Sequence, residues 1–178
     1  MKAVGVVRKI DDLGRLVIPK EIRRKLGIQF GDPLEVFTNA NGDIFLQKHS
    51  PIKELGDFIK NYVEVIHEQL GHFVFVCDRD VYIHVAGVKQ KDYTGHQISV
   101  LVDMALKKRV PTVNKVAGNA TFIDGMYERL ASYIIAPIVV DGDVLGGLVM
   151  ASIDTTFGDV EIKTARVAAK FLGKHMSE

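Results

Sequence analysis

The sequence predicts an α+β protein with two domains, over residues 1–50 and 51–178. In the first fifty residues, short apolar runs alternate with turns rich in Asp, Asn and Gly, which is typical of small β-structures. After residue 50, pairs of strand-like runs alternate with helical patterns, which favours an antiparallel sheet flanked by helices. The dipeptide Ser50-Pro51 marks the start of the second domain, because it is typical of a helix start.

Charge is distributed unevenly between the two domains. The formal net charge of the chain is +1, but residues 1–25 contain eight Lys/Arg and three Asp/Glu, which gives 8 − 3 = +5. The remaining residues therefore sum to 1 − 5 = −4. A short basic segment on a mildly acidic body indicates a polyanionic partner for the N-terminal domain, with a solvated charged face as the alternative.

Composition indicates the compartment. The chain is 47% hydrophobic and 25% charged, as in soluble globular proteins. No apolar run is long enough for a transmembrane helix, and the first ten residues lack the apolar core of a signal peptide. The single cysteine, Cys77, excludes an intramolecular disulfide and suits a reducing compartment. We expect a cytoplasmic, nucleoid-associated protein with no membrane partner.

Four strand-like runs are expected in the first domain, over residues 3–10, 15–18, 34–37 and 43–47. Residues 11–14 form the turn between the first two. The last two flank Asn41-Gly42, a strong hairpin signal because both residues tolerate positive φ.

A short helix is expected between the two strand pairs, over residues 19–26. Pro19 suits the first helical position, where its missing N–H costs nothing, and Gly27 suits the residue just past the end. Ile22 and Leu26 share one face of this helix.

Basic residues gather on the opposite face of the helix and at the preceding hairpin. Arginine suits a DNA contact because its planar fork spans two acceptors on a phosphate or a guanine, whereas lysine mostly neutralises phosphate. Asp11 and Asp12 are expected to orient the arginines or to stabilise the turn. The candidate DNA-binding residues are Arg8, Lys9, Arg15, Lys20, Arg23 and Arg24.

The first domain is too small to be stable alone, because about fifty residues with short strands bury little surface. Its first strand is apolar on both faces, with Val4, Val6 and Ile10 on one and Val7 on the other. We therefore expect an obligate dimer in which both chains contribute strands. Coverage by the second domain of the same chain is the alternative.

A long motif gives the first domain a family resemblance. Residues 5–37 read GVVRKIDDLGRLVIPKEIRRKLGIQFGDPLEVF and resemble the AbrB family of swapped-hairpin regulators, which includes the antitoxin MazE. The resemblance implies a dimeric β-barrel of interlocked hairpins that binds double-stranded DNA. Its DNA-contacting arginines correspond to Arg8, Arg15, Arg23 and Arg24, and charge adds Lys9 and Lys20.

Two strand pairs are expected in the second domain, residues 73–77 with 81–85 and residues 133–140 with 144–152. Further helices are expected over residues 96–108 and 158–176, and residues 111–125 read as a loop.

The first and last helices of the second domain carry apolar residues at alternating steps of three and four, which is typical of a seam between packed helices. We expect an intersubunit bundle that joins two DNA-binding heads, and packing of each helix on its own sheet is the alternative. The candidate oligomerisation residues are Ile52, Leu55, Ile59, Tyr62, Ile66, Ile162, Ala165, Ala169 and Leu172.

The sequence predicts neither an enzyme nor a metal site. Cys77 ends an apolar run, where a buried and inert thiol is usual, and a dithiol cycle needs a second cysteine. The six histidines lack paired ligand spacing, and neither a nucleophile elbow nor a phosphate-binding glycine loop is present. Asp78 and Asp80 flank a tight turn, which they are expected to cap.

The order of elements makes the second domain similar to a GAF domain, as do the stretches LGDFIKNY and GHFVFVCDRDVYI. Such domains often enclose a small ligand, so an unidentified effector is the one cofactor we allow for. An AbrB-type head on a GAF-like body is similar to regulators of late, forespore-stage sporulation genes. This resemblance implies a homotetramer that activates some promoters and represses others. An antitoxin-type autoregulator and a ligand-responsive regulator of other genes are the alternatives.

Overall fold

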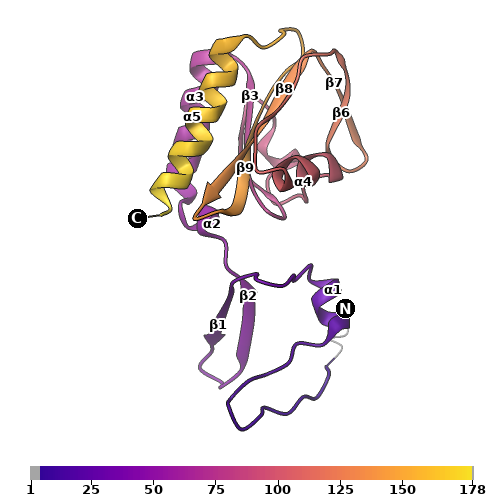
Figure 1. The fold of residues 1–178 in the computed structure, drawn as a ribbon, viewed down its shortest axis with the longest axis vertical. Helices are drawn as coiled ribbons and strands as arrows, with labels where there is room; N and C mark the ends of the chain where they lie inside the picture. Colours follow the sequence, from indigo (N-terminus) through magenta and orange to yellow (C-terminus); the bar gives the residue numbers. More distant parts are fainter. Residues whose placement is uncertain (1–4, 178) are drawn as a thin grey trace. The chain divides into compact units, whose positions relative to one another are not determined.

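The computed structural model describes residues 5–177, and its contacts divide the chain into two units, Met1–His49 and Ser50–Glu178 (Figure 1). Each unit is described by itself below. None of the described helices is both long and apolar enough to span a membrane.

The first unit contains helix α1 (Lys20–Lys25) and a hairpin of β1 (Leu34–Thr38) and β2 (Ile44–Lys48). The strands pair antiparallel, with Val36 opposite Leu46. The side chain of Asn39 stabilises the turn, since its Oδ1 accepts from the backbone N–H groups of Asn41 and Asp43 at 3.0 and 2.9 Å. The predicted hairpin is confirmed.

The two strands expected before α1 do not form in the single chain. Residues 5–10 and 15–18 have no strand assignment, and residues 3 and 4 lie outside the described part. The connecting turn is present, because the Gly14 N–H donates to the Asp11 carbonyl at 3.0 Å. A strand needs a neighbour to satisfy its backbone groups, and within one chain these segments have none.

The described residues of the first unit form no apolar core. Neither buried hydrophobic cluster of the described residues includes a residue before Ile52. Large apolar side chains are instead exposed, Val7 by 94% and Phe30 fully. The others are Val6, Ile10, Leu13, Leu16, Val17, Leu26, Val36, Phe37, Ile44, Phe45 and Leu46.

A five-stranded antiparallel sheet forms the centre of the second unit, in the order β4-β3-β9-β8-β5. Its strands are β3 (Phe73–Asp78), β4 (Tyr82–Ala86), β5 (Thr112–Asn114), β8 (Ser132–Val140) and β9 (Asp143–Ser152). The remaining elements are α2 (Pro51–Glu54), α3 (Gly56–Leu70), the 3₁₀ turn η1 (Gln90–Asp92), α4 (Val100–Lys107), β6 (Gly118–Ile123), β7 (Met126–Leu130) and α5 (Asp159–His175).

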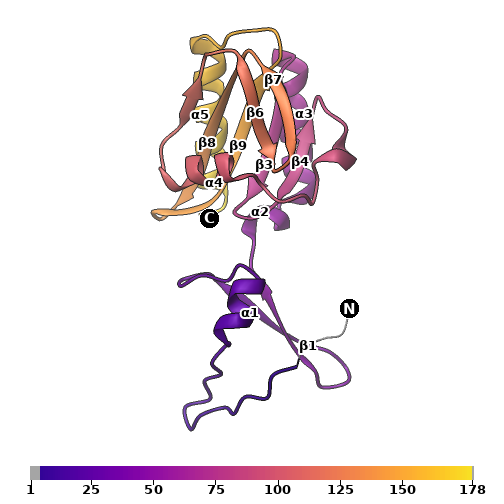
Figure 2. The same cartoon turned by 90° about the vertical axis from the view of Figure 1, so that its right-hand side faces the viewer.

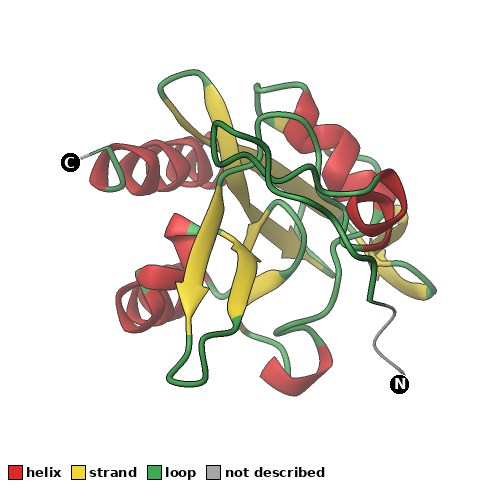
Figure 3. Cartoon of the chain, turned by 90° about the horizontal axis from the view of Figure 1, so that it is seen from below, coloured by secondary structure: helices red, strands yellow, loops and turns green. Residues whose placement is uncertain are grey.

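The sheet is covered on both faces, as expected (Figures 1 and 2). Helices α3 and α5 lie side by side on one face, over a cluster that includes Ile59, Ile134 and Leu172. Helix α4 and the β6–β7 hairpin cover the other face, over a cluster that includes Phe75 and Phe122. Figure 3 shows the strands with helices on either side. Successive side chains of each strand point to opposite faces of the sheet, so the same strands contribute to both clusters.

Two predicted elements of the second unit need correction. Residues 111–125 are not a loop, because they contain β5 and β6, and β6 pairs with the unpredicted β7. The first helix is interrupted at Leu55 and divides into α2 and α3. Ser50 stands at the N-cap of α2, but its hydroxyl donates to Asp78 Oδ2 at 3.0 Å rather than accepting from the helix.

The predicted oligomerisation seam lies inside one chain. Leu55, Tyr62 and Ile162 are partly buried, and the other residues of the set face the sheet of their own unit: Ile52, Ile59, Ile66, Ala165, Ala169 and Leu172. Ile52, Ile59, Ala165 and Leu172 are completely buried there. Packing on the sheet of the same chain therefore accounts for the alternating spacing.

Candidate nucleic-acid interface

All six candidate DNA-binding residues lie in the first unit, and all six are exposed. Lys20, Arg23 and Arg24 come from α1, and Arg15 follows the turn before it. Arg8 and Lys9 lie in the extended segment that enters this turn. The structure thus places six solvent-accessible cations within seventeen consecutive residues, which suits contact with a polyanion.

The turn before α1 holds Arg15 in a defined position. Asp11 Oδ1 accepts from the backbone N–H groups of Leu13 and Arg15, at 3.1 and 2.7 Å. Its Oδ2 accepts from Arg15 Nε at 2.8 Å. Hydrogen bonds from the backbone and then the side chain of Arg15 lower the pKa of the Asp11 carboxyl. Asp11 therefore both closes the turn and orients one arginine, while the remaining guanidinium N–H groups stay free for other acceptors.

Helix α1, which carries three of the basic side chains, is short and has defined ends. The buried Pro19 occupies the N-cap position, and its carbonyl accepts from the Arg23 N–H at 3.0 Å. Gly27 ends the helix with φ +62°, in the left-handed region that glycine favours. Arg23 and Arg24 lie in the last turn, where the helix dipole favours cations.

Within residues 5–177, Arg15 has an ion pair with Asp11, and no described carboxylate pairs with the other five cations. Basic side chains without intramolecular partners remain free to displace counterions from a phosphate backbone. The same unit also exposes apolar residues such as Val7 and Leu16. Exposed apolar side chains indicate an interaction surface, which argues against a face that is merely solvated.

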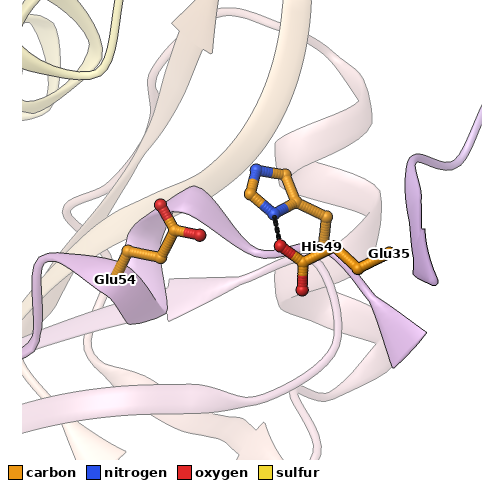
Figure 4. Close-up of side chains that lie close together, drawn as sticks. All are labelled: Glu35, His49 and Glu54. Carbon is orange, nitrogen blue, oxygen red and sulfur yellow. Dashed lines mark hydrogen bonds and ion pairs between the residues drawn. The ribbon is translucent and has the colours of Figure 1, made fainter. Parts of the chain in front are cut away.

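Two other features of the described residues involve groups with possible chemical roles. Burial raises the pKa of the Cys77 thiol to about 12, and the side chain is inaccessible, so the thiol cannot act as a nucleophile near neutral pH. In the first unit His49 Nδ1 lies 2.8 Å from Glu35 Oε1 (Figure 4). Glu54, the third side chain drawn in Figure 4, belongs to the second unit.

Sequence reasoning missed two sets of residues in the second unit. Phe58, Phe171 and His175 are exposed and form an aromatic strip on α3 and α5 together with the partly buried Tyr62, the one member that the sequence predicted. Glu128 is a partly buried acid in β7. The sequence does indicate its position, because Glu128 lies two residues from each of the apolar Met126 and Leu130 and so shares their face of a strand.

Comparisons with known proteins agree with this division. Residues 54–177 match the family model for the C-terminal, transcription factor region of stage V sporulation protein T, and residues 7–54 match the model for the bacterial antitoxin MazE. The chain is 47% identical to stage V sporulation protein T of Bacillus subtilis (strain 168) over 178 residues, which is 100% of both chains. The transition state regulatory protein AbrB of the same organism is 51% identical over 51 residues, 29% of this chain and 52% of AbrB.

The second unit resembles solved GAF domains in fold. A GAF domain/HD domain protein from Geobacter sulfurreducens aligns with a TM-score of 0.54 at 19% identity, covering 70% of this chain and 95% of that one. The expected fold, an AbrB-like head with a GAF-like sheet flanked by helices, is confirmed. On the full-length identity and the family model that covers most of its residues, the chain belongs to the stage V sporulation protein T family of transcription factors.

Proposed function

We propose that this transcription regulator grips double-stranded DNA with a basic surface formed by two interlocked N-terminal units, and that residues 1–50 and 51–178 act as a DNA-binding head and an assembly body. It controls late, forespore-stage sporulation genes, activating some promoters and repressing others. The observation that carries the proposal is that the head exposes both its cations and its apolar side chains and buries no core. We place it in the cytoplasm, on the nucleoid.

The missing core supports an obligate head dimer. Residues 5–10 and 15–18 flank a hydrogen-bonded turn but form no strand. This arrangement suits a hairpin whose strands pair with strands of a second chain. A second copy would supply the missing strands and cover Val7, Val17 and Phe45. Burial of apolar surface yields roughly 25 cal/mol per Å², so covering many such side chains stabilises the dimer strongly. Dimerisation also doubles the basic set to twelve cations.

A different face supports assembly of two such dimers. On α3 and α5, Phe58 stacks on Tyr62 with ring centroids 5.9 Å apart and on His175 at 4.8 Å, and Tyr62 stacks on Phe171 at 5.6 Å. Phe58 and Phe171 remain 38% and 47% exposed. Exposed aromatic strips of this kind favour contacts between subunits. Contact through this strip gives a homotetramer with two heads, which raises avidity for DNA.

An antitoxin role has less support. The match of residues 7–54 to the MazE model concerns the head. The remainder is a folded unit with two buried clusters, whereas a toxin-neutralising tail is expected to be short and disordered.

The DNA-binding proposal is tested with four single variants: Arg8→Ala, Arg15→Ala, Arg23→Ala and Arg24→Ala. Each is expected to weaken binding of the full chain to duplex DNA in a gel-shift titration, while its oligomeric state and circular dichroism stay those of the wild type. Lys108→Ala, in the body, is the matched control and should bind normally. Wild-type affinity for all four arginine variants would refute the interface.

The tetramer is tested by charging the aromatic strip. The double variant Phe58→Glu with Phe171→Glu is expected to elute as a dimer that still binds DNA, with lower avidity. Val100→Glu, which charges an exposed valine of α4, is the control and should remain a tetramer. A tetramer that survives the double variant would exclude this face.

A further inference from the structure

A cavity of about 610 Å³ opens at the edge of the second unit, beside β7 and the connection that follows β4. Its volume lies in the range of small-molecule sites. Aromatic rings fill the space between the sheet and α4, where Phe75 lies 5.0 Å from Tyr93 and 5.5 Å from Phe122, between ring centroids. Tyr93 also lines the cavity, so the cavity borders this aromatic cluster.

The apolar part of its wall includes Phe73, Val88 and Leu130. Four charged side chains also line it. Lys89 and Arg129 are exposed, so solvent screens their charges, while Asp92 and Glu128 are partly buried.

Glu128 occupies a position normally held by an apolar residue. Along β7, Met126, Glu128 and Leu130 point to one face, and Tyr127, which is 76% exposed, points to the other. Leu130 is buried, and so is Ala120, the cross-strand partner of Glu128. The carboxylate is thus directed inward from an amphipathic strand.

The charge of this carboxylate is not compensated by the protein. Glu128 Oε2 is buried and has no hydrogen-bond partner among the described residues. Burial raises the pKa of the Glu128 carboxyl. Burial, its largest cause, also raises the pKa of the Tyr82 hydroxyl. A buried acceptor without a donor is costly, and it leaves the carboxylate poorly compensated. Because the partly buried Glu128 lines the cavity, a cation from outside the chain can approach its charge there.

We propose that this cavity binds a small organic cation, which directs an ammonium or amidinium N–H toward the Glu128 carboxylate and lays its apolar body against Phe73, Val88 and Leu130. Such a ligand supplies the positive charge that the carboxylate lacks. The site lies wholly in the second unit and does not rest on the proposed DNA contacts.

The probe pair is phenethylammonium and 2-phenylethanol, which share an apolar body and differ in the charged N–H group. Both are titrated into the full-length protein by calorimetry. The ammonium compound is expected to bind the wild type at least about tenfold more tightly than the alcohol, as for a charge-assisted hydrogen bond. Glu128→Gln is expected to remove this preference, whereas the control Glu68→Gln, on exposed α3 surface, retains it.

Equal affinity for the two compounds, no binding of the ammonium compound, or a preference that survives in Glu128→Gln would overturn the proposal. Thermal unfolding of the free variant separates ligand binding from a structural role. Removing an uncompensated charge is expected to leave the melting temperature of Glu128→Gln unchanged or raise it by about 2–4 °C. A clearly lower melting temperature would show that the fold needs the carboxylate, and would also overturn the proposal.

Discussion

Replacing Arg24 by glutamine should weaken the salt dependence of DNA binding. Because the head is a dimer, the substitution removes one phosphate contact from each of two chains. The side chain lies exposed in the last turn of α1, without an intramolecular ion pair among the described residues. Counting the arginines alone, four candidates in each of two chains give eight phosphate contacts, and contacts from Lys9 and Lys20 would add equally to the slopes of wild type and variant. The slope of log affinity against log salt is then about −7 for the wild type, at about 0.9 per contact.

Arg24→Gln removes two of the eight contacts, because the substitution occurs in both chains. The slope should become shallower, at about −5.4 for the six remaining contacts. Between about 50 and about 200 mM salt, wild-type affinity should drop about 10⁴-fold and the affinity of the variant about 10³-fold.

The assay is fluorescence anisotropy of a labelled duplex at four or more salt concentrations. Lys25→Gln is the control, since Lys25 is exposed on the same helix but lies outside the basic face. Its slope should match that of the wild type. An unchanged slope for Arg24→Gln, or an equal change for Lys25→Gln, would refute the assignment of this face to the phosphates.

Three further outcomes are expected. Val7→Asp, at a side chain 94% exposed in the single chain, should abolish the head dimer and DNA binding, whereas Val116→Asp in the body, 76% exposed, should do neither in sizing and gel-shift experiments. Gly146→Ala should lower the free energy of unfolding by about 1–3 kcal/mol in urea titrations, because the new Cβ would overlap the Cys77 carbonyl oxygen and lie 2.8 Å from Asp78 Cα; Gly118→Ala, with open space, should be close to neutral, and equal stabilities would contradict the packing. Because burial raises the pKa of the Cys77 thiol to about 12, iodoacetamide should leave native protein unmodified at mildly alkaline pH and should label it fully in guanidinium; rapid native labelling would place the thiol elsewhere.

Local sequence signals predicted the strand pairs whose backbone hydrogen bonds are formed within one chain. The pairs β3–β4 and β8–β9 follow from apolar alternation around tight turns, and Asp78 caps the first turn as expected, accepting from the Asp80 and Val81 N–H groups at 2.8 and 2.7 Å. The β6–β7 hairpin escaped prediction because the charged Glu128 stands at an inward-facing position of β7, between Met126 and Leu130, where alternation expects an apolar residue.

Sequence spacing could not identify the surface that an apolar stripe packs on. Ile59 and Leu172 lie at positions that suit a helix bundle, yet both are completely buried against their own sheet. Conversely, the runs around Val7 and Val17 read as strands but remain unpaired, because the neighbour they need is not in the same chain. The basic residues could be identified from the sequence because charge, unlike packing, is read directly from residue type.

The number of chains on one DNA duplex tests the central claim most directly, and native mass spectrometry of the full-length protein with a short duplex measures it. If the N-terminal units gain their core and their DNA-binding surface only by pairing, complexes should contain two or four chains at every protein concentration. A stable complex of one chain with one duplex would contradict the account.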